Sequence, residues 1–256
     1  MKCNVFGVAA VVGGLLFVAS PDAGAQAQGD AIRVLISNGL KTSLEALRPD
    51  AENAVGRPIA MEFSSTAALK MRIQSGERFD ATLITLEAIR ELIKEGKLAA
   101  TPTADLGFSP LVVGIRAGAP KPDLGTIDGL KRALLSAKSI TYPRDGATRG
   151  YLEQMFDRLG IASQVTPKII LAEAPSSAAE SVASGRVELV LQLFSEIAPV
   201  HGLEVAGPLP GDLRHQVNFA GAASATAANP AAVKALLEFL SGPRAAAMLK
   251  AKGVSR

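Results

Sequence analysis

The chain has 256 residues, of which 48% are hydrophobic and 20% are charged, and its formal net charge is +3. This balance excludes a globally disordered chain and provides enough apolar material for one large domain or two small ones. Lys and Arg are scattered, Trp is absent, and Tyr142 and Tyr151 are the two tyrosines. The sequence shows neither a basic stripe nor a stacking platform, so we expect no nucleic-acid partner.

Residues 1–27 have the pattern of a secretory signal peptide. Lys2 gives a positive start, residues 5–18 form an apolar run too short to span a bilayer comfortably, and small-x-small cleavage sites follow at residues 23–27. The alternative is a buried or membrane-anchoring helix. Cys3 is the single cysteine and lies in this segment, so the mature chain is predicted to lack thiol chemistry and disulfides. We therefore expect an exported protein in the periplasm of a bacterium.

After this segment the chain alternates between strand-like and helix-like stretches. Short apolar runs, apolar residues at helical spacing and glycines at helix ends define them. The first series predicts strands at 32–36, 59–63 and 79–84, with helices at 40–55, 66–76 and 86–93. This order is typical of a parallel sheet with helices on both faces.

A second series begins with an apolar strand at 111–115 that no helix directly precedes. It predicts strands at 139–142, 165–171 and 187–191, with helices at 126–136, 148–159 and 177–184. An extended stretch at 213–220 leads to two C-terminal helices, the first capped by Asn229-Pro230 and the last at 244–252.

The predicted fold class is therefore α/β, with two doubly wound lobes. Extended segments near 106–115 and 213–222 are expected to form two crossings between the lobes. The predicted boundaries give residues 28–109 and 220–256 to the first lobe and residues 110–219 to the second. A ligand would lie in the cleft between them, at the carboxyl ends of strands and the N-termini of helices.

Three strand-to-helix junctions, at residues 37–39, 64–66 and 144–150, combine small residues with hydroxyls or amides. Backbone N–H groups at such junctions can approach an anion, although Ser, Thr and Asn are also the ordinary helix caps. The planar fork of an arginine at the third junction would bind a carboxylate bidentately, and a glutamine that ends an apolar strand can face the cleft. The predicted ligand-binding residues are Asn38, Gly39, Ser65, Thr66, Thr148, Arg149 and Gln192.

The sequence offers few residue patterns that are typical of a catalytic or metal-binding site. His201 and His215 lack neighbours at metal-ligand spacing, and the sequence has no nucleophile elbow, phosphate loop or dinucleotide fingerprint. We therefore predict no metal and no cofactor. Glu196 can be read as an acid/base group, but a cap or surface carboxylate is the favoured interpretation.

The order of elements resembles the type II periplasmic solute-binding proteins, and among them the molybdate-binding-protein-like group. The residues that carry this resemblance are 34–47, 63–69 with Ile73 and Gly76, Phe79-Asp80, Gly160 and 193–197. The resemblance implies a monomer that closes around a small anion by hinge bending and delivers it to an ABC permease in the inner membrane. Oxyanions such as molybdate and organic acids both remain open as ligands.

In the molybdate-binding group, the resemblance implies an oxyanion held by hydroxyls and backbone amides at the first two junctions and in the second lobe. Ser65 or Thr66 matches the second junction. Gly39 stands where the family has a serine, Leu193 stands where it has a tyrosine, and Arg149 is an additional cation.

A periplasmic aconitate isomerase resembles the same family, which gives the alternative function. Such an enzyme moves a double bond in a tricarboxylate by proton transfer, without metal or nucleotide, and needs carboxylate-binding donors and a positioned acid/base. Arg149 would serve the first role and Glu196 or Asp145 the second. A ligand-sensing domain that presents its state to a receptor is a third hypothesis.

Overall fold

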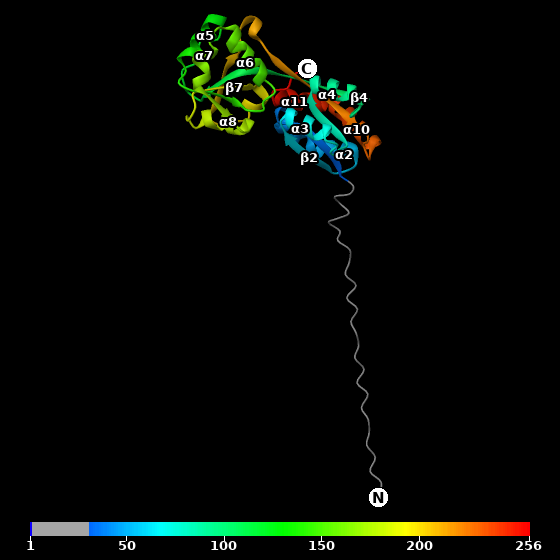
Figure 1. Ribbon diagram of the computed structural model, residues 1–256. Coiled ribbons are helices and arrows are strands. Elements are labelled where there is room, and N and C mark those ends of the chain that lie inside the picture. The colour runs from blue at the N-terminus through cyan, green and yellow to red at the C-terminus, as the bar shows by residue number, and fades with distance from the viewer. Residues whose placement is uncertain (2–30) are drawn as a thin grey trace. The chain divides into compact units, whose positions relative to one another are not determined.

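The structure, a computed structural model, describes residues 31–256 besides Met1. The predicted signal peptide, with Cys3 in it, lies outside the described residues. Among residues 31–256, no helix is long and apolar enough to cross a membrane. The strands of this part form one nine-stranded sheet in the order β2-β1-β3-β9-β4-β7-β5-β6, with β8 beside β4. Two lobes of mixed strands and helices result, as Figure 1 shows.

The first lobe is built on parallel strands followed by helices. The described elements of its N-terminal part are β1 (Ile32–Ser37), the 3₁₀ helix η1 (Asn38–Leu40), α2 (Lys41–Val55), β2 (Ile59–Ser64), α3 (Thr66–Gln74), β3 (Ala81–Thr85) and α4 (Leu86–Lys94). β1 lies between β2 and β3 and is parallel to both. The C-terminal helices α10 (Pro230–Ser241) and α11 (Pro243–Ala251) pack against α2.

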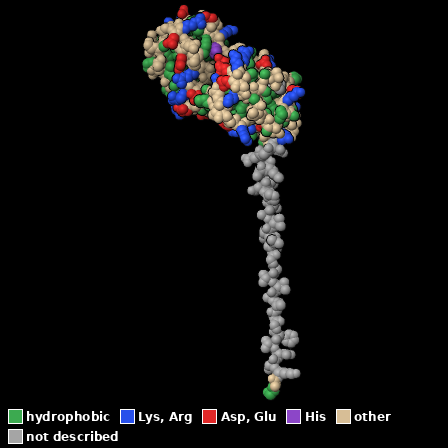
Figure 2. Space-filling view, turned by 45° about the vertical axis from the view of Figure 1, so that its right-hand side comes forward, with side chains coloured by type: hydrophobic (Ala, Val, Ile, Leu, Met, Phe, Trp, Pro, Cys, Tyr) green, Lys and Arg blue, Asp and Glu red, His purple; other side chains and the backbone are tan. Residues whose placement is uncertain are grey.

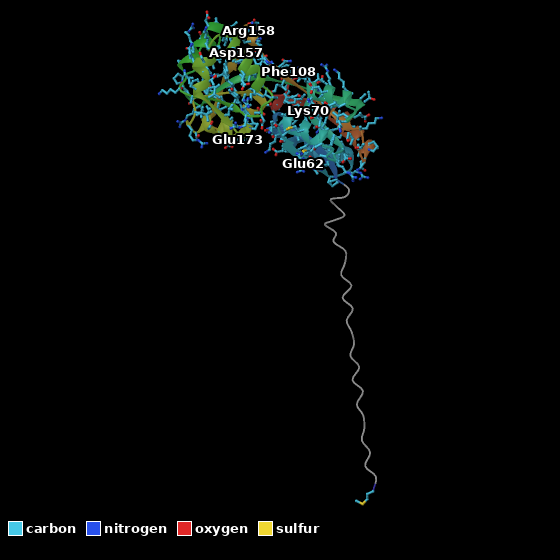
Figure 3. The ribbon with its side chains drawn as sticks, in the orientation of Figure 1. Glu62, Lys70, Phe108, Asp157, Arg158 and Glu173 are labelled. Atoms are coloured by element: carbon cyan, nitrogen blue, oxygen red, sulfur yellow. The ribbon has the colours of Figure 1, made fainter. Side chains whose placement is uncertain are left out.

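Two long antiparallel strands cross between the lobes. β4 (Leu98–Arg116) pairs with β9 (Gln216–Ser224) from Leu98 to Pro110, and its last residues pair with β7 and β8 of the second lobe. Phe108, on the crossing part of β4, lies between the lobes in Figure 3. These strands are the two connections that the sequence predicts.

The second lobe repeats the strand-helix alternation. Its described elements are α5 (Ile127–Ser136), β5 (Ile140–Pro143), α6 (Arg149–Arg158), α7 (Ala162–Val165), η2 (Thr166–Lys168), β6 (Ile169–Ala172), α8 (Pro175–Ala183), β7 (Leu189–Leu193), α9 (Phe194–Ile197), β8 (Leu203–Pro208) and η3 (Gly211–Leu213). β5 is parallel to both β6 and β7, so the carboxyl ends of these three strands meet at one edge of the sheet.

In each lobe the sheet buries apolar side chains on both faces, because successive residues of a strand point to opposite sides. In β1, Val34 and Ile36 join the core beneath α2 and α10, whereas Leu35 joins the core beneath α3 and α4. In β4, Val113 and Val112 divide in the same way between the two cores of the second lobe. Each such fully buried side chain contributes about 1.5–3 kcal/mol. The lobes are therefore doubly wound, as predicted.

Three predicted details differ from the structure. The strand predicted at 165–171 begins only at Ile169, because Val165 ends a helix and Pro167 lies in a 3₁₀ turn. The crossing strand begins at Leu98, well before the predicted segment, since pairing with β9 makes an extended strand of a stretch rich in Pro, Gly and Asp. The short α9 and β8 were not predicted.

Candidate functional site

A cavity of about 560 Å³ lies between the two lobes. Its walls come from the segments that follow β1 and β2 in the first lobe and β5, β6 and β7 in the second. These segments lead into η1, α3, α6, α8 and α9, so the cavity lies where carboxyl ends of strands meet N-termini of helices. Backbone N–H groups and partial positive charge are concentrated at such a place. The cavity therefore has the position in which the sequence places a ligand.

The first-lobe wall consists of hydroxyl and amide groups. Ser37 ends β1, Asn38 begins η1, and Thr66 Oγ1 donates a hydrogen bond to Ser37 Oγ at 3.3 Å. Ser65 is the N-cap of α3, and its Oγ accepts from the backbone N–H of Ala68 at 3.1 Å. Because β1 and β2 are parallel and in register at Ser37, both junctions open on the same side. The wall offers several hydrogen-bond donors to a ligand.

Lys41 is the one cationic side chain among the described residues that line this cavity. It begins α2, one helical turn after Asn38. Its Nζ lies 5.8 Å from the centroid of the Phe63 ring and 4.0 Å from Glu45 Oε1, and the side chain is more than half exposed. Lys41 therefore supplies an accessible positive charge to the first-lobe wall.

The second-lobe wall includes a carboxyl group in the short helix α9. Glu196 is half-buried at the third position of this helix. The nearby backbone N–H of Leu193 and the Gln192 side chain favour its ionised form, but burial outweighs them and raises the pKa of Glu196 to about 7. Glu196 thus exchanges its proton near neutral pH.

Ser195 adjoins Glu196 on the same wall. Its backbone N–H donates to Ser109 Oγ at 3.0 Å, while its own Oγ is buried without a hydrogen-bond partner among the described residues. The residue is 4% exposed and lines the cavity. A buried hydroxyl left unpaired costs about 1–3 kcal/mol. A ligand that accepts this hydrogen bond would recover that free energy.

The structure brings three of the predicted residues together. Asn38, Ser65 and Thr66 all line the cavity. Gly39 is buried one residue beyond Asn38, where a Cβ would lie 2.6 Å from Cζ of Phe219. The glycine therefore permits close packing under the cavity wall.

The other three predicted residues do not line this cavity. Thr148 is buried at the start of α6. Arg149 Nε donates to Glu153 Oε1 at 2.9 Å and its Nη1 donates to the carbonyl of Arg144 at 3.0 Å. Gln192 is 1% exposed and its Nε2 donates to the carbonyl of Pro175 at 3.1 Å. Gln192 lies near Glu196, where its amide favours the ionised carboxylate and so acts against the raised pKa.

Several cavity residues were outside the predicted ligand-binding set. Lys41 was missed because an exposed lysine at a helix start has no distinctive sequence pattern. Ser195 lies two residues after the end of β7, and the segment 173–176 follows β6 with Pro175 at the first helical position. The strand-end rule applied to the first two junctions also finds these two places. Asp145, which belongs to the third predicted junction and was considered as an acid/base, lines the cavity as well.

A second cavity, of about 690 Å³, adjoins the first and shares Thr66 and residues 145–147 with it. Ala67, the start of α4, residues of α6 and the segment 215–218 complete its walls. The His215 ring stacks on Tyr151 with centroids 3.9 Å apart, and the Tyr151 hydroxyl donates to the carbonyl of Leu213 at 2.7 Å. Burial lowers the pKa of His215, which favours the neutral ring.

No group of three or more His, Cys, Asp or Glu side chains in the described part of the chain is placed to hold a metal ion. Acidic and basic side chains are interspersed over the face of both lobes seen in Figure 2. The chemistry of the cavity therefore rests on hydroxyls, amides, one lysine and its carboxyl groups.

Two α/β lobes with a polar cavity at their strand ends define the class of two-lobed binding proteins. The sequence model of the family described as bacterial extracellular solute-binding protein matches residues 32–255, so the chain belongs to this family. The resemblance found in the sequence is thereby confirmed.

Two curated relatives carry different functions. The chain is 28% identical to an aconitate isomerase from Pseudomonas over 249 residues, which cover 95% of this chain and 94% of the relative. It is 24% identical to the molybdate-binding protein ModA of Azotobacter vinelandii over 231 residues, which cover 89% and 90% of the two chains.

The fold is also that of solved binding proteins. The periplasmic molybdate-binding protein of Azotobacter vinelandii superposes with a TM-score of 0.73 at 18% identity, covering 88% of this chain and 99% of that one. This likeness establishes the shared architecture and leaves the ligand open.

Proposed function

We propose that the chain is a periplasmic binding protein that takes a small anion into the 560 Å³ cavity and delivers it to an ABC permease. The observation that carries this proposal is the convergence of helix N-termini and hydroxyl groups from both lobes on that cavity. Asn38, Ser65 and Thr66 are the donors proposed for the ligand, with Lys41 as the accompanying cation. An organic acid is favoured over molybdate, because Gly39 and Leu193 replace the hydroxyl side chains that the resemblance implies.

Ligand binding is proposed to close the two lobes on the crossing strands β4 and β9. A ligand that contacts both walls interacts more strongly with the closed form than with an open one, and so shifts the population toward closure. This mechanism needs no metal and no cofactor. The permease would recognise the closed form, and the proposed binding protein acts as a monomer.

A thermal-unfolding screen tests the binding proposal. The purified chain is heated alone and with citrate, isocitrate, cis- and trans-aconitate, molybdate, tungstate and sulfate. A true ligand at a hundred times its dissociation constant adds about 2.7 kcal/mol to the free energy of unfolding. We expect at least one of the organic acids to raise the melting temperature, and Lys41→Met to reduce that rise. The binding proposal is wrong if none of these anions changes the melting temperature.

Isomerisation of a tricarboxylate is the second candidate function. Two observations favour it: the 28% identity to an aconitate isomerase along nearly the whole chain, and a carboxyl group in the cavity whose pKa lies near 7. A group that titrates near the working pH is suited to move a proton from one carbon to another. Glu196 is the proposed acid/base on this reading.

Incubation with trans-aconitate separates the two candidates. The product mixture is followed by chromatography, because catalysis converts one isomer to the other whereas binding leaves the ligand unchanged. Turnover by the wild type that Glu196→Gln abolishes would establish the isomerase and displace the transport proposal. Binding of trans-aconitate without conversion would leave the binding protein as the function.

Export by the N-terminal segment remains part of the proposal. The family is described as extracellular, and cleavage near residue 27 would release the folded part into the periplasm. Cell fractionation and N-terminal sequencing of the product test this point. An uncleaved chain that stays in the cytosol would contradict it.

A further inference from the structure

Glu196 differs from the other carboxyl groups that line the cavity because it is half-buried and has no ion-pair partner among the described residues. Among the described residues, the other three are Glu45, which pairs with Lys41, Glu173, which pairs with Arg144, and Asp145, which is exposed. Near Glu196, the Leu193 N–H and the Gln192 side chain are neutral donors. An ionised Glu196 would therefore place an uncompensated negative charge on the wall of an anion-binding cavity.

The elements packed against α9 do not compensate that charge. α9 contacts β4, β7, β8, α8 and η1, of which β7 and η1 contain no ionisable side chain. The charged residues of the other three are Asp105 and Arg116 on β4, Glu204 on β8, which pairs with Lys121, and Glu180 on α8, which is exposed. The C-terminal segment that packs on Ser195 adds the half-buried Lys252. None of these described groups forms an ion pair with Glu196.

Ser195 gives an independent indication of a ligand at the same place. The residue lines the cavity, and its buried Oγ has no hydrogen-bond partner among the described residues. A hydroxyl and a neutral carboxyl on adjacent residues of one cavity wall can both donate hydrogen bonds to a ligand. A carboxylate, with two acceptor oxygens, matches such a pair.

We propose that Glu196 takes up one proton when an organic acid binds, and that its neutral carboxyl and the Ser195 hydroxyl then donate hydrogen bonds to a carboxylate of that ligand. This inference rests on the proposed function of the cavity. No covalent bond of the ligand changes: the proton comes from the solvent and remains on Glu196, and the ligand keeps its charge.

In the unliganded protein, the pKa of Glu196 already lies close to the pH range in which this uptake would occur. Burial raises the pKa of Glu196 to about 7, and a bound anion raises it further, because a like charge disfavours the ionised form. Binding therefore consumes a proton at pH values above about 7, where the free protein has lost it. Below that pH the proton is already present and none is taken up.

The two walls also define the kind of organic acid. Lys41 on the first lobe offers a full positive charge, whereas Ser195 and Glu196 on the second offer neutral donors. An acid with two or more carboxylates is able to use both walls at once. A cavity of about 560 Å³ suits a small polycarboxylate, since ligand pockets are about 300–1,000 Å³ in size.

Titration calorimetry with citrate and with trans-aconitate tests the inference on the whole folded protein. Each titration is repeated at pH 6 and pH 8.5 in two buffers of different ionisation enthalpy, because the difference in heat gives the number of protons taken up. We expect close to one proton per ligand at pH 8.5 and close to none at pH 6. The affinity should fall about tenfold per pH unit above pH 7.

Glu196→Gln imitates the neutral acid and serves as the critical variant. It should bind as tightly as the wild type at pH 6, more tightly at pH 8.5, and with no proton uptake at either pH. Glu204→Gln is the matched control, because Glu204 lies on β8 against α9 but pairs with Lys121 outside the cavity. The control should keep the proton uptake of the wild type.

The outcomes separate this inference from the function on which it rests. Tight binding of either acid without proton uptake at pH 8.5 overturns the role of Glu196 and leaves the binding function intact. Failure of both acids to bind the wild type at either pH overturns the organic-acid proposal and the inference with it. If Glu196→Gln does not fold, the number of protons that the wild type takes up per ligand at pH 8.5 still tests the inference.

Discussion

Glu196 links the cavity to the stability of the protein at the scale of a single residue. Its pKa is about 7 in the folded protein and near 4.5 in an unfolded chain, so the folded state holds the proton to higher pH. The free energy of unfolding therefore falls as the pH rises from 4.5 to 7. A shift of this size corresponds to at most about 3 kcal/mol. The carboxyl group is thus costly to the fold, as functional groups often are.

Glu196→Gln should remove this pH dependence. At pH 8 the variant is expected to be more stable than the wild type by about 1–3 kcal/mol, and at pH 4.5 the two should be equal. Urea unfolding at both pH values measures the difference. Equal stability of the two proteins at pH 8 would show that the folded protein does not perturb this carboxyl group.

Lys41 and Arg149 can be compared directly as ligand-binding cations. Lys41→Met should weaken organic-acid binding by about 1 kcal/mol, roughly fivefold, because an exposed cation interacts through a well-screened field. Arg149→Met should change the affinity less than twofold, since Glu153 and the Arg144 carbonyl engage its guanidinium. Calorimetry on the two variants tests the sequence-based assignment of Arg149. A larger loss from Arg149→Met would restore that residue to the site.

The site residues that could be predicted from the sequence are those that directly follow the end of a strand. Asn38, Ser65 and Thr66 follow strand ends, and that rule depends on chain order alone. Arg149 also follows a strand end, but its side chain forms an ion pair with Glu153, one helical turn later. The unpaired hydroxyl of Ser195 depends on β4 and β7 lying side by side, which no local pattern reveals.

At the scale of elements, α9 is a second-lobe helix that is fixed by first-lobe packing. Leu193 at its N-cap belongs to the core beneath α2, and η1 packs against the helix. The C-terminal segment pairs with β4, where Phe108 and Ser255 exchange backbone hydrogen bonds of 2.7 and 2.8 Å. This segment brings Gly253 against the backbone of Ser195. The chain terminus therefore supports the wall that carries Glu196.

Gly253→Ala should disturb α9 through this contact. A Cβ at Gly253 would lie 2.7 Å from Cδ1 of Phe194 and 3.0 Å from Cα of Ser195, and its φ of +89° is in the left-handed region. Gly76→Ala is the matched control, because Gly76 has a φ of +90° and nothing lies within 4 Å of a Cβ there. We expect Gly253→Ala to lose about 1–3 kcal/mol more than the control and also to weaken ligand binding.

Thermal unfolding of the two variants, followed by calorimetry with citrate, measures both effects. Equal losses from Gly253→Ala and Gly76→Ala would mean that only backbone conformation matters. A stability loss with unchanged ligand affinity would mean that the terminus supports the fold without positioning α9.

The elements that sequence reasoning predicted are those with strong local periodicity. α2, α4 and α10 bury every third or fourth residue, and β1, β3 and β7 are short apolar runs. The first half of β4 lacks such a pattern, and it is extended because β9, more than a hundred residues later, pairs with it. α9 has four residues and depends on its neighbours in both lobes, so no periodicity marks it.

At the scale of the whole molecule, the fold places five strand ends around one cavity from two lobes. The two crossing strands β4 and β9 run from one lobe into the other. A ligand that contacts both walls should therefore stabilise them together, whereas a ligand bound to one lobe would stabilise that lobe alone. The predicted lobe boundaries at 109 and 219 stay predictions.

Hydrogen–deuterium exchange with and without a saturating organic acid tests most directly whether both lobes hold one ligand. We predict that binding slows amide exchange simultaneously at residues 37–42 and 65–69 of the first lobe and at residues 193–197 of the second. Protection confined to one lobe, or centred on residues 215–218 and the start of α4, would contradict the account.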